Sequence, residues 1–168
     1  MPAPAELIAL DLIERLKTTS VDGNAVSQVV RVNRDAKNWA PKHLSIAVSR
    51  QLESRLPRLD HEGNPPAKAY QLPWNIHCAV ILSDKRHEQG GNDAAVPLDE
   101  VIQNEAALAI RAAVENGPTW YRLGAVSFDA DWGDTMPFTS TNGTAAGITL
   151  VLRTRYRISE TNPSEVRA

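Results

Sequence analysis

Apolar and polar residues alternate along the last strand-like segment of the chain, from Ile148 to Ser159. The apolar residues share one parity: Ile148, Leu150, Leu152, Tyr156 and Ile158. Three arginines share the other parity: Arg153, Arg155 and Arg157. In a β-strand this period places the apolar side chains on one face and successive guanidinium groups about 6.6 Å apart on the other. The pattern therefore predicts a strand with a basic face, whose arginines repel one another unless negative charges lie nearby.

An earlier segment, AVSFDADW at residues 125–132, has the complementary pattern. Asp129 and Asp131 alternate there with apolar residues: Val126, Phe128, Ala130 and Trp132. If the two segments pair as antiparallel strands, the aspartates and the arginines lie on one side of the sheet and stabilise each other. Three arginines against two aspartates leave one guanidinium unmatched, so contact of this arginine with a partner stays open.

The remaining periodicity predicts two helices and three more strands. The helices run from Pro4 to about Lys17 and from Pro97 to Asn116. The strands lie within residues 25–34, 43–56 and 71–84, and the last two look like an antiparallel hairpin. The order α-β-β-β-α-β-β predicts the α+β class, a mainly antiparallel sheet with two helices packed on one face. We expect one domain over residues 1–168, with a flexible tail from about residue 160.

Two long polar loops are expected at residues 83–96 and 133–147. Loops of this length in a compact domain are usually functional or disordered. The second carries Met136, Pro137 and Phe138. Apolar residues at such a tip suit docking to another chain, and folding back over the sheet is the alternative. We therefore include Met136 and Phe138 with the arginines and aspartates as candidate partner or subunit contacts.

Composition narrows the function class. Hydrophobic residues at 42% and charged residues at 23% are ordinary for a globular domain, and the net charge of −2 argues against wholesale binding of nucleic acid or anionic membrane. The N-terminus does not read as a signal peptide, and no segment reads as a membrane span. The single Cys78 excludes an internal disulfide.

Chemistry-bearing residues show no catalytic or metal-binding motif. The four histidines, at His43, His61, His77 and His87, lack the spacing of metal ligands. Cys78 shares the parity of Trp74 and Ile76, so we expect a buried, unreactive thiol. Asp129 and Asp131 could act as an acid/base pair, but their spacing is more typical of the wet face of a strand. We expect no catalytic residue, no metal and no cofactor.

The order of segments resembles the tail terminator proteins of long-tailed bacteriophages, from about Ala5 to Ser159. The resemblance rests on these segments: the helix AELIALDLIERLK, the hairpin LSIAVSRQLE and QLPWNIHCAVIL, the helix PLDEVIQNEAALAIRAAV, and the closing LVLRTRYRI. It implies a non-enzymatic minor tail protein that forms a ring, commonly a hexamer, on the head-proximal end of the tail tube. Such a ring stops tube polymerisation and presents a surface for head-completion proteins.

The resemblance implies a virion protein that is assembled in the host cytoplasm. Its partners would be copies of itself, the tail tube protein and a head-completion or connector protein. We expect no membrane partner and no specific binding of nucleic acid. DNA can still pass through the lumen of the ring without being bound specifically. Two alternatives remain open: another neck, head-tail connector or tail-completion protein, and a small cytoplasmic enzyme with an unrecognised site.

Overall fold

The computed structural model describes residues 2–21, 23–32, 44–81, 98–139, 145–159 and 166–167. Within these ranges the helices are α1 (Pro4–Leu16) and α3 (Leu98–Val114), with short 3₁₀ turns η2 (Pro57–Leu59) and η3 (Leu123–Ala125). The strands are β1 (Ser20–Val21), β2 (Asn24–Ala25), β3 (Gln28–Arg31), β4 (Leu44–Arg50), β5 (Ser54–Arg55), β6 (Ala67–Ile81), β7 (Ser127–Thr139), β8 (Ala145–Ser159) and β9 (Val166–Arg167). The predicted α+β class is confirmed, with the order of elements close to the predicted one.

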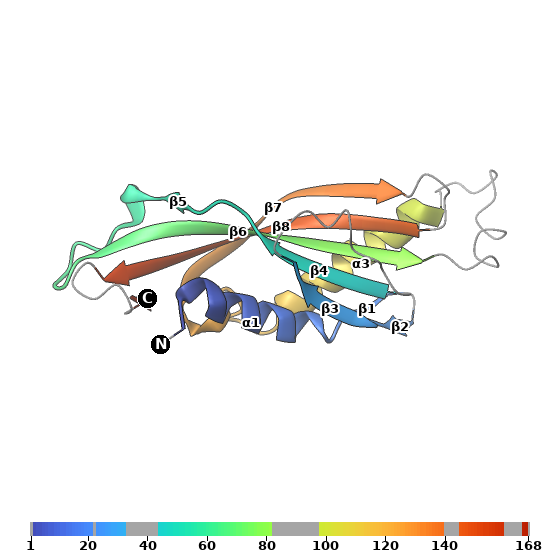
Figure 1. Ribbon diagram of the computed structural model, residues 1–168, viewed down its shortest axis with the longest axis horizontal. Helices are drawn as coiled ribbons and strands as arrows, with labels where there is room; N and C mark the ends of the chain where they lie inside the picture. The colour runs from blue at the N-terminus through green and yellow to red at the C-terminus, as the bar shows by residue number, and fades with distance from the viewer. Residues whose placement is uncertain are drawn as a thin grey trace.

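The main sheet has the strand order β3-β4-β6-β8-β7, and β5 and β9 pair with β6 and β8 (Figure 1). Only the β3–β4 pair is parallel among the strand pairs of the described chain. Strands β6 and β8 pair without interruption from Ala67↔Ser159 to Ile81↔Ala145. The predicted hairpin is confirmed, because β4 pairs antiparallel with the second half of β6. Among the described strands, the sheet therefore ends at β3 on one side and at β7 on the other.

Both helices cover the same face of the sheet and share one core with it (Figure 1). The apolar parity of β8 points into this core, where Ile148, Leu150, Leu152 and Tyr156 are buried. Thr154 has the same parity and is also buried. Its hydroxyl donates to the Leu72 carbonyl at 2.7 Å and accepts the Trp74 indole N–H at 3.2 Å. These bonds satisfy the polar groups that the core would otherwise leave unpaired.

A polar contact of α1 holds the end of α3 and the turn that leads into β7. Arg15 donates to the Val114 carbonyl at 2.8 Å, a group that the end of α3 leaves without a helical partner, and to the Trp120 carbonyl in the following turn at 2.6 Å. Asp11 accepts from Arg15 and from the Gly124 N–H at 2.7 Å. Gly124 has φ +61°, and a β-carbon there would collide with the backbone of α1. Helix α1 and the start of β7 are thereby joined.

The predicted loop at 133–147 is wrong. Strand β7 continues to Thr139 and β8 begins at Ala145, so Met136, Pro137 and Phe138 belong to a strand. A register shift between Trp132 and Thr135 inserts an extra residue at Gly133 and Asp134. This bulge breaks the two-residue period, so the polar segment shows no continuous strand pattern in the sequence.

Another bulge lies nearer the start of β7, between Ser127 and Asp129, and we number the two in chain order, so that this is the first bulge and the one at Gly133 and Asp134 the second. The first bulge changes which β7 side chains face the core. Ser127 is buried, accepting the Leu123 N–H at 2.7 Å and donating to the Tyr121 carbonyl. Phe128 lies instead on the arginine face, so its predicted place on the apolar face was wrong. The bulge adds one residue and thereby reverses the side-chain alternation.

Two other predictions concern segments at the limits of the described chain. The expected loop at 83–96 lies outside the described residues. Val166–Arg167, within the segment expected to be a flexible tail, pair with β8 as the short strand β9.

Gly147 in β8 has room for no side chain. A β-carbon there would collide with the Cys78 carbonyl and the Phe138 ring. We therefore predict that Gly147→Ala lowers the free energy of unfolding by about 1–3 kcal/mol, as overpacking does, measured by urea denaturation. Adding Phe138→Ala should not restore the wild-type value, because the carbonyl stays in place. Full recovery in the double variant would show that the ring alone requires glycine.

Candidate functional site

The predicted acidic and basic faces meet on the side of the sheet opposite the helices. The register places Asp129 opposite Arg155 and Asp131 opposite Arg153. Arg155 reaches Asp129 at 2.6 Å and Asp131 at 3.0 Å, and Arg153 reaches Asp131 at 2.7 Å. The predicted charge matching is confirmed for these four residues, which we call the charge ladder.

Arg155 is the centre of the charge ladder. Its side chain is only 16% exposed, and its Nε donates to the Gln71 side chain of β6 at 3.1 Å. It thus links three strands, β6, β8 and β7, through one guanidinium. A planar guanidinium with several fixed donors suits this role better than a lysine ammonium would. The arginine row is therefore held within the chain.

Arg157, the arginine without a matching aspartate, also has partners within the chain. Its guanidinium carbon lies 3.9 Å from the centroid of the Phe128 ring, and its Nε donates to the Leu59 carbonyl at 2.8 Å. The first bulge of β7 is what places Phe128 there. A cation over an aromatic face is attracted by the ring quadrupole. The role of Arg157 in subunit contact stays a prediction.

The turn that accepts Arg157 is anchored by an ion pair on its other side. Asp60 accepts two bonds from Arg55, at 2.5 and 2.6 Å, and one from the Ala69 N–H at 2.8 Å. These bonds, those from Arg55 first, lower the pKa of Asp60 from 3.8 to about 2. Segment 55–60 is thereby held on β6, with the Leu59 carbonyl in reach of Arg157.

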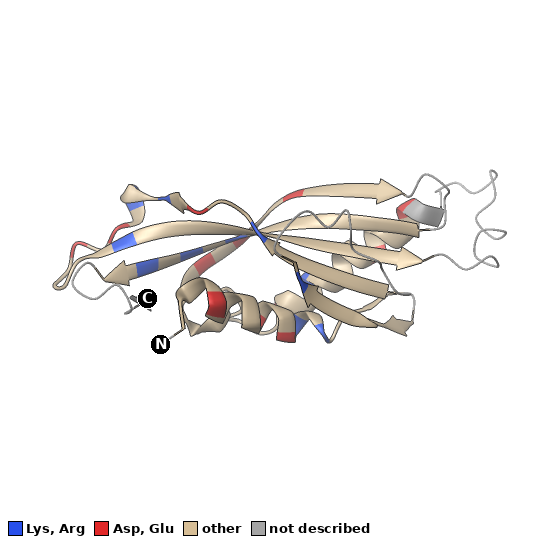
Figure 2. Ribbon diagram, in the orientation of Figure 1, with Lys and Arg blue, Asp and Glu red and all other residues tan. Residues whose placement is uncertain are grey.

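On the other half of the same face, which we call the uncharged half, β6 and β8 carry no Lys, Arg, Asp or Glu. Figure 2 shows charged positions of β6 and β8 confined to one half of these strands. On the uncharged half, Met136 lies opposite Thr149 and Phe138 opposite Gly147, so both face away from the helices. Met136 is 70% and Phe138 38% exposed. All seven predicted site residues therefore lie on one face of β7 and β8, in a charged and an apolar group.

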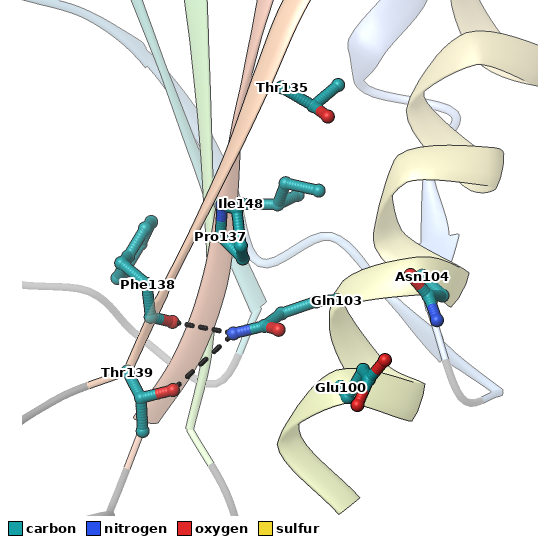
Figure 3. Close-up of a pocket in the computed structure, with 8 residues that line it drawn as sticks. All are labelled: Glu100, Gln103, Asn104, Thr135, Pro137, Phe138, Thr139 and Ile148. Atoms are coloured by element: carbon teal, nitrogen blue, oxygen red, sulfur yellow. Dashed lines mark hydrogen bonds between the residues drawn. The ribbon is translucent and has the colours of Figure 1, made fainter. Parts of the chain in front are cut away.

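A pocket that the sequence did not predict lies between α3 and the end of β7 (Figure 3). Its volume is about 530 Å³, and its lining includes Asn104 of α3, Pro137 of β7 and Ile148 of β8. Gln103 reaches from α3 to the Phe138 carbonyl at 2.9 Å and tethers the two elements. Sequence reasoning missed the pocket because it placed this part of β7 in a loop.

An aromatic cluster beside the second bulge was also missed. The rings of Trp120 and Trp132 stack with centroids 6.5 Å apart, and Arg111 of α3 lies 5.9 Å from the Trp132 centroid. The Trp132 indole donates to Glu115 at 2.7 Å. The sequence shows that Arg111 and Glu115 are one helical turn apart, and so lie on the same side of the helix. Their common contact with Trp132 depends on the tertiary fold.

The remaining chemistry-bearing residues lie apart from one another. Cys78 is buried, as predicted, and burial raises the pKa of its thiol to about 12. The His77 ring contacts the Thr149 hydroxyl at 2.8 Å, on the opposite face from Cys78. His43 and His87 lie outside the described residues. In the described part of the chain, no group of three or more potential ligands is arranged to hold a metal ion.

Comparison with known proteins adds no family assignment. No family model matches the chain, and no curated protein matches it either. Among the described helices, none combines the length and the apolar character needed to cross a membrane.

Removing the centre of the charge ladder should weaken the fold modestly. We predict that Arg155→Ala lowers the free energy of unfolding by about 1 kcal/mol, because Asp129 and Asp131 lose their shared cation. Urea denaturation at low and high salt checks this, and the loss should shrink at high salt. Arg58→Ala, at an exposed arginine, is the matched control. Equal losses in the two variants would mean that the charge ladder contributes nothing beyond solvation.

Asp60 should make stability depend on acid pH. Because its pKa falls to about 2 on folding, its contribution is fully present above about pH 4 and is lost as the pH drops toward 2. Asp60→Asn should therefore differ most from wild type above pH 4 and converge with it near pH 2, measured by urea denaturation. Glu62→Gln, at an exposed position in the same turn region, is the control for the loss of one negative charge. A constant Asp60→Asn difference at every pH would contradict the assignment.

Proposed function

We propose that this chain is a ring-forming structural protein of a phage tail, a tail terminator. In this role it caps the head-proximal end of the tail tube, stops tube polymerisation and offers a surface to the head-completion protein. The observation that carries the proposal is the end of the sheet at β7, a strand with exposed apolar side chains whose outer side pairs with no described strand.

The open sheet supports self-association. A strand at the end of a sheet presents unpaired N–H and C=O groups that can pair with another chain. Strand β7 spans 13 residues, and every residue from Asp134 to Thr139 is exposed. Because the sheet has two unlike ends, head-to-tail contacts between copies are available, and such contacts close into rings when the rotation permits.

The order of elements supports the tail terminator role within the ring-forming class. An amphipathic first helix, a strand, a long hairpin, a second helix and a closing strand pair follow one another along the chain. This is the order on which the resemblance to tail terminators rests. The charged and apolar halves of the exposed face also provide two chemically different surfaces on one subunit.

Self-association and tube capping can be tested separately. We predict ring-shaped particles by negative-stain electron microscopy and a mass of several copies by light scattering. Added to polymerising tail tube protein of the same phage, the ring should bind one tube end and arrest growth, whereas tubes without it should keep lengthening. A protein that stays monomeric, free and with tubes present, would refute the proposal. Location in the virion away from the tube end would instead favour another neck protein.

A further inference from the structure

We infer that the ring contact joins the edge of β7 in one copy to the edge of β3 in the next. The inference rests on the proposed function, because it names the two surfaces that would close the ring. We call residues 134–139 the β7 edge and residues 28–31 the β3 edge. The partner is a second copy of this chain, and each copy uses a different edge for each neighbour.

The two edges are the ends of the sheet and have similar lengths. No described strand pairs with the outer side of either β3 or β7. Beyond the second bulge, β7 has a regular register from Thr135 to Thr139, five residues, and β3 has four, Gln28–Arg31. The bulge at Gly133 and Asp134 bends the strand and so limits a new pairing to this last regular segment.

Strand directions favour this contact. Strand β3 runs parallel to β4, and the successive pairs β4–β6, β6–β8 and β8–β7 are antiparallel. Strands β3 and β7 therefore run in opposite directions. When the next copy keeps the same orientation, its β3 lies antiparallel to β7, as most neighbouring strands do. Two β7 edges would also pair antiparallel, but only about a two-fold axis, which gives a closed dimer.

The side chains at the two edges match in character. Cross-strand neighbours form one row on the face away from the helices: Val30, Ala47, His77, Thr149 and Met136. Val30 and Met136 are the two ends of this row, Val30 half-buried and Met136 exposed. Joining the sheets of two copies brings the Met136 end of one row to the Val30 end of the next. An apolar side chain that is exposed in the single copy would then gain apolar neighbours.

Pro137 explains why such an edge is selective. Proline has no N–H, and within sheets it is confined to edge strands, where the missing donor faces outward. The β7 edge therefore offers fewer hydrogen bonds than an ordinary edge, which discourages indiscriminate pairing. The side chains of Met136 and Phe138 lie on the face opposite to that of Pro137. With fewer backbone hydrogen bonds available, these two side chains determine which partner binds.

Complementation of two charge variants tests the inference. Met136→Lys damages the β7 edge, Val30→Lys damages the β3 edge, and Leu52→Lys is the control, because Leu52 is 89% exposed and lies on neither edge. Light scattering should show rings for wild type and Leu52→Lys. Each edge variant should be monomeric, with association weakened about tenfold or more. An equal mixture of the two should form a heterodimer, since each retains the edge that the other lacks.

Cross-linking tests the same contact without depending on the folding of Val30→Lys. In one copy the two edges are four strand spacings apart, about 19 Å, so a short bis-maleimide cannot join them within a subunit. Met136→Cys with Val30→Cys should give a ladder of cross-linked multimers, and each single variant should give none. Buried Cys78 should leave the wild type unlinked.

The outcomes separate the inference from the proposed function. A wild-type protein that never associates would refute ring formation, and with it the proposed function. If both lysine variants still form rings, the edge contact is overturned, but ring formation itself is not. Dimers cross-linked through Met136→Cys alone would show that two β7 edges meet. Disruption by Met136→Lys but not by Val30→Lys, with no ladder, would assign the β7 edge to a different partner and overturn the inference.

Discussion

The pairing of β6 with β8 is the constraint on which the rest of the molecule depends. It is continuous from Ala67↔Ser159 to Ile81↔Ala145 and carries β4 on one side and β7 on the other. Because side chains alternate along a strand, a slip of one residue would move Arg153 and Arg155 into the core and Leu152 out of it. The buried bond between Thr154 and Trp74 ties these strands together at one position. The register thus sets both the core and the exposed face.

That exposed face has a half whose charged side chains have partners within the chain and a half whose apolar side chains remain exposed. In the charged half, Arg155 connects both aspartates and Gln71, while Arg157 has Phe128 and the Leu59 carbonyl. In the uncharged half, Met136 remains mostly exposed on a terminal strand. Of the candidate partner contacts that the sequence suggested, Met136 and Phe138 at the end of β7 are therefore favoured over the arginines.

The bulges of β7 produce this division. The first places Phe128 under Arg157 and buries Ser127, so the third arginine gains a partner inside the chain. The second separates the charge ladder from the segment 135–139. Extra residues in edge strands bend the strand and redirect its side chains, so a single strand can serve both a structural and an interaction role.

Local periodicity in the sequence determined helices α1 and α3, the β4–β6 hairpin and the opposition of aspartates to arginines. These predictions succeeded because side-chain spacing alone sets which residues share a face. It did not determine the length of β7, the place of Phe128 or the pocket at Gln103. Those depended on two inserted residues and on the packing of α3 against β7, contacts between segments far apart in the chain. Only the tertiary structure could decide them, because bulges and long-range packing leave no regular period in the sequence.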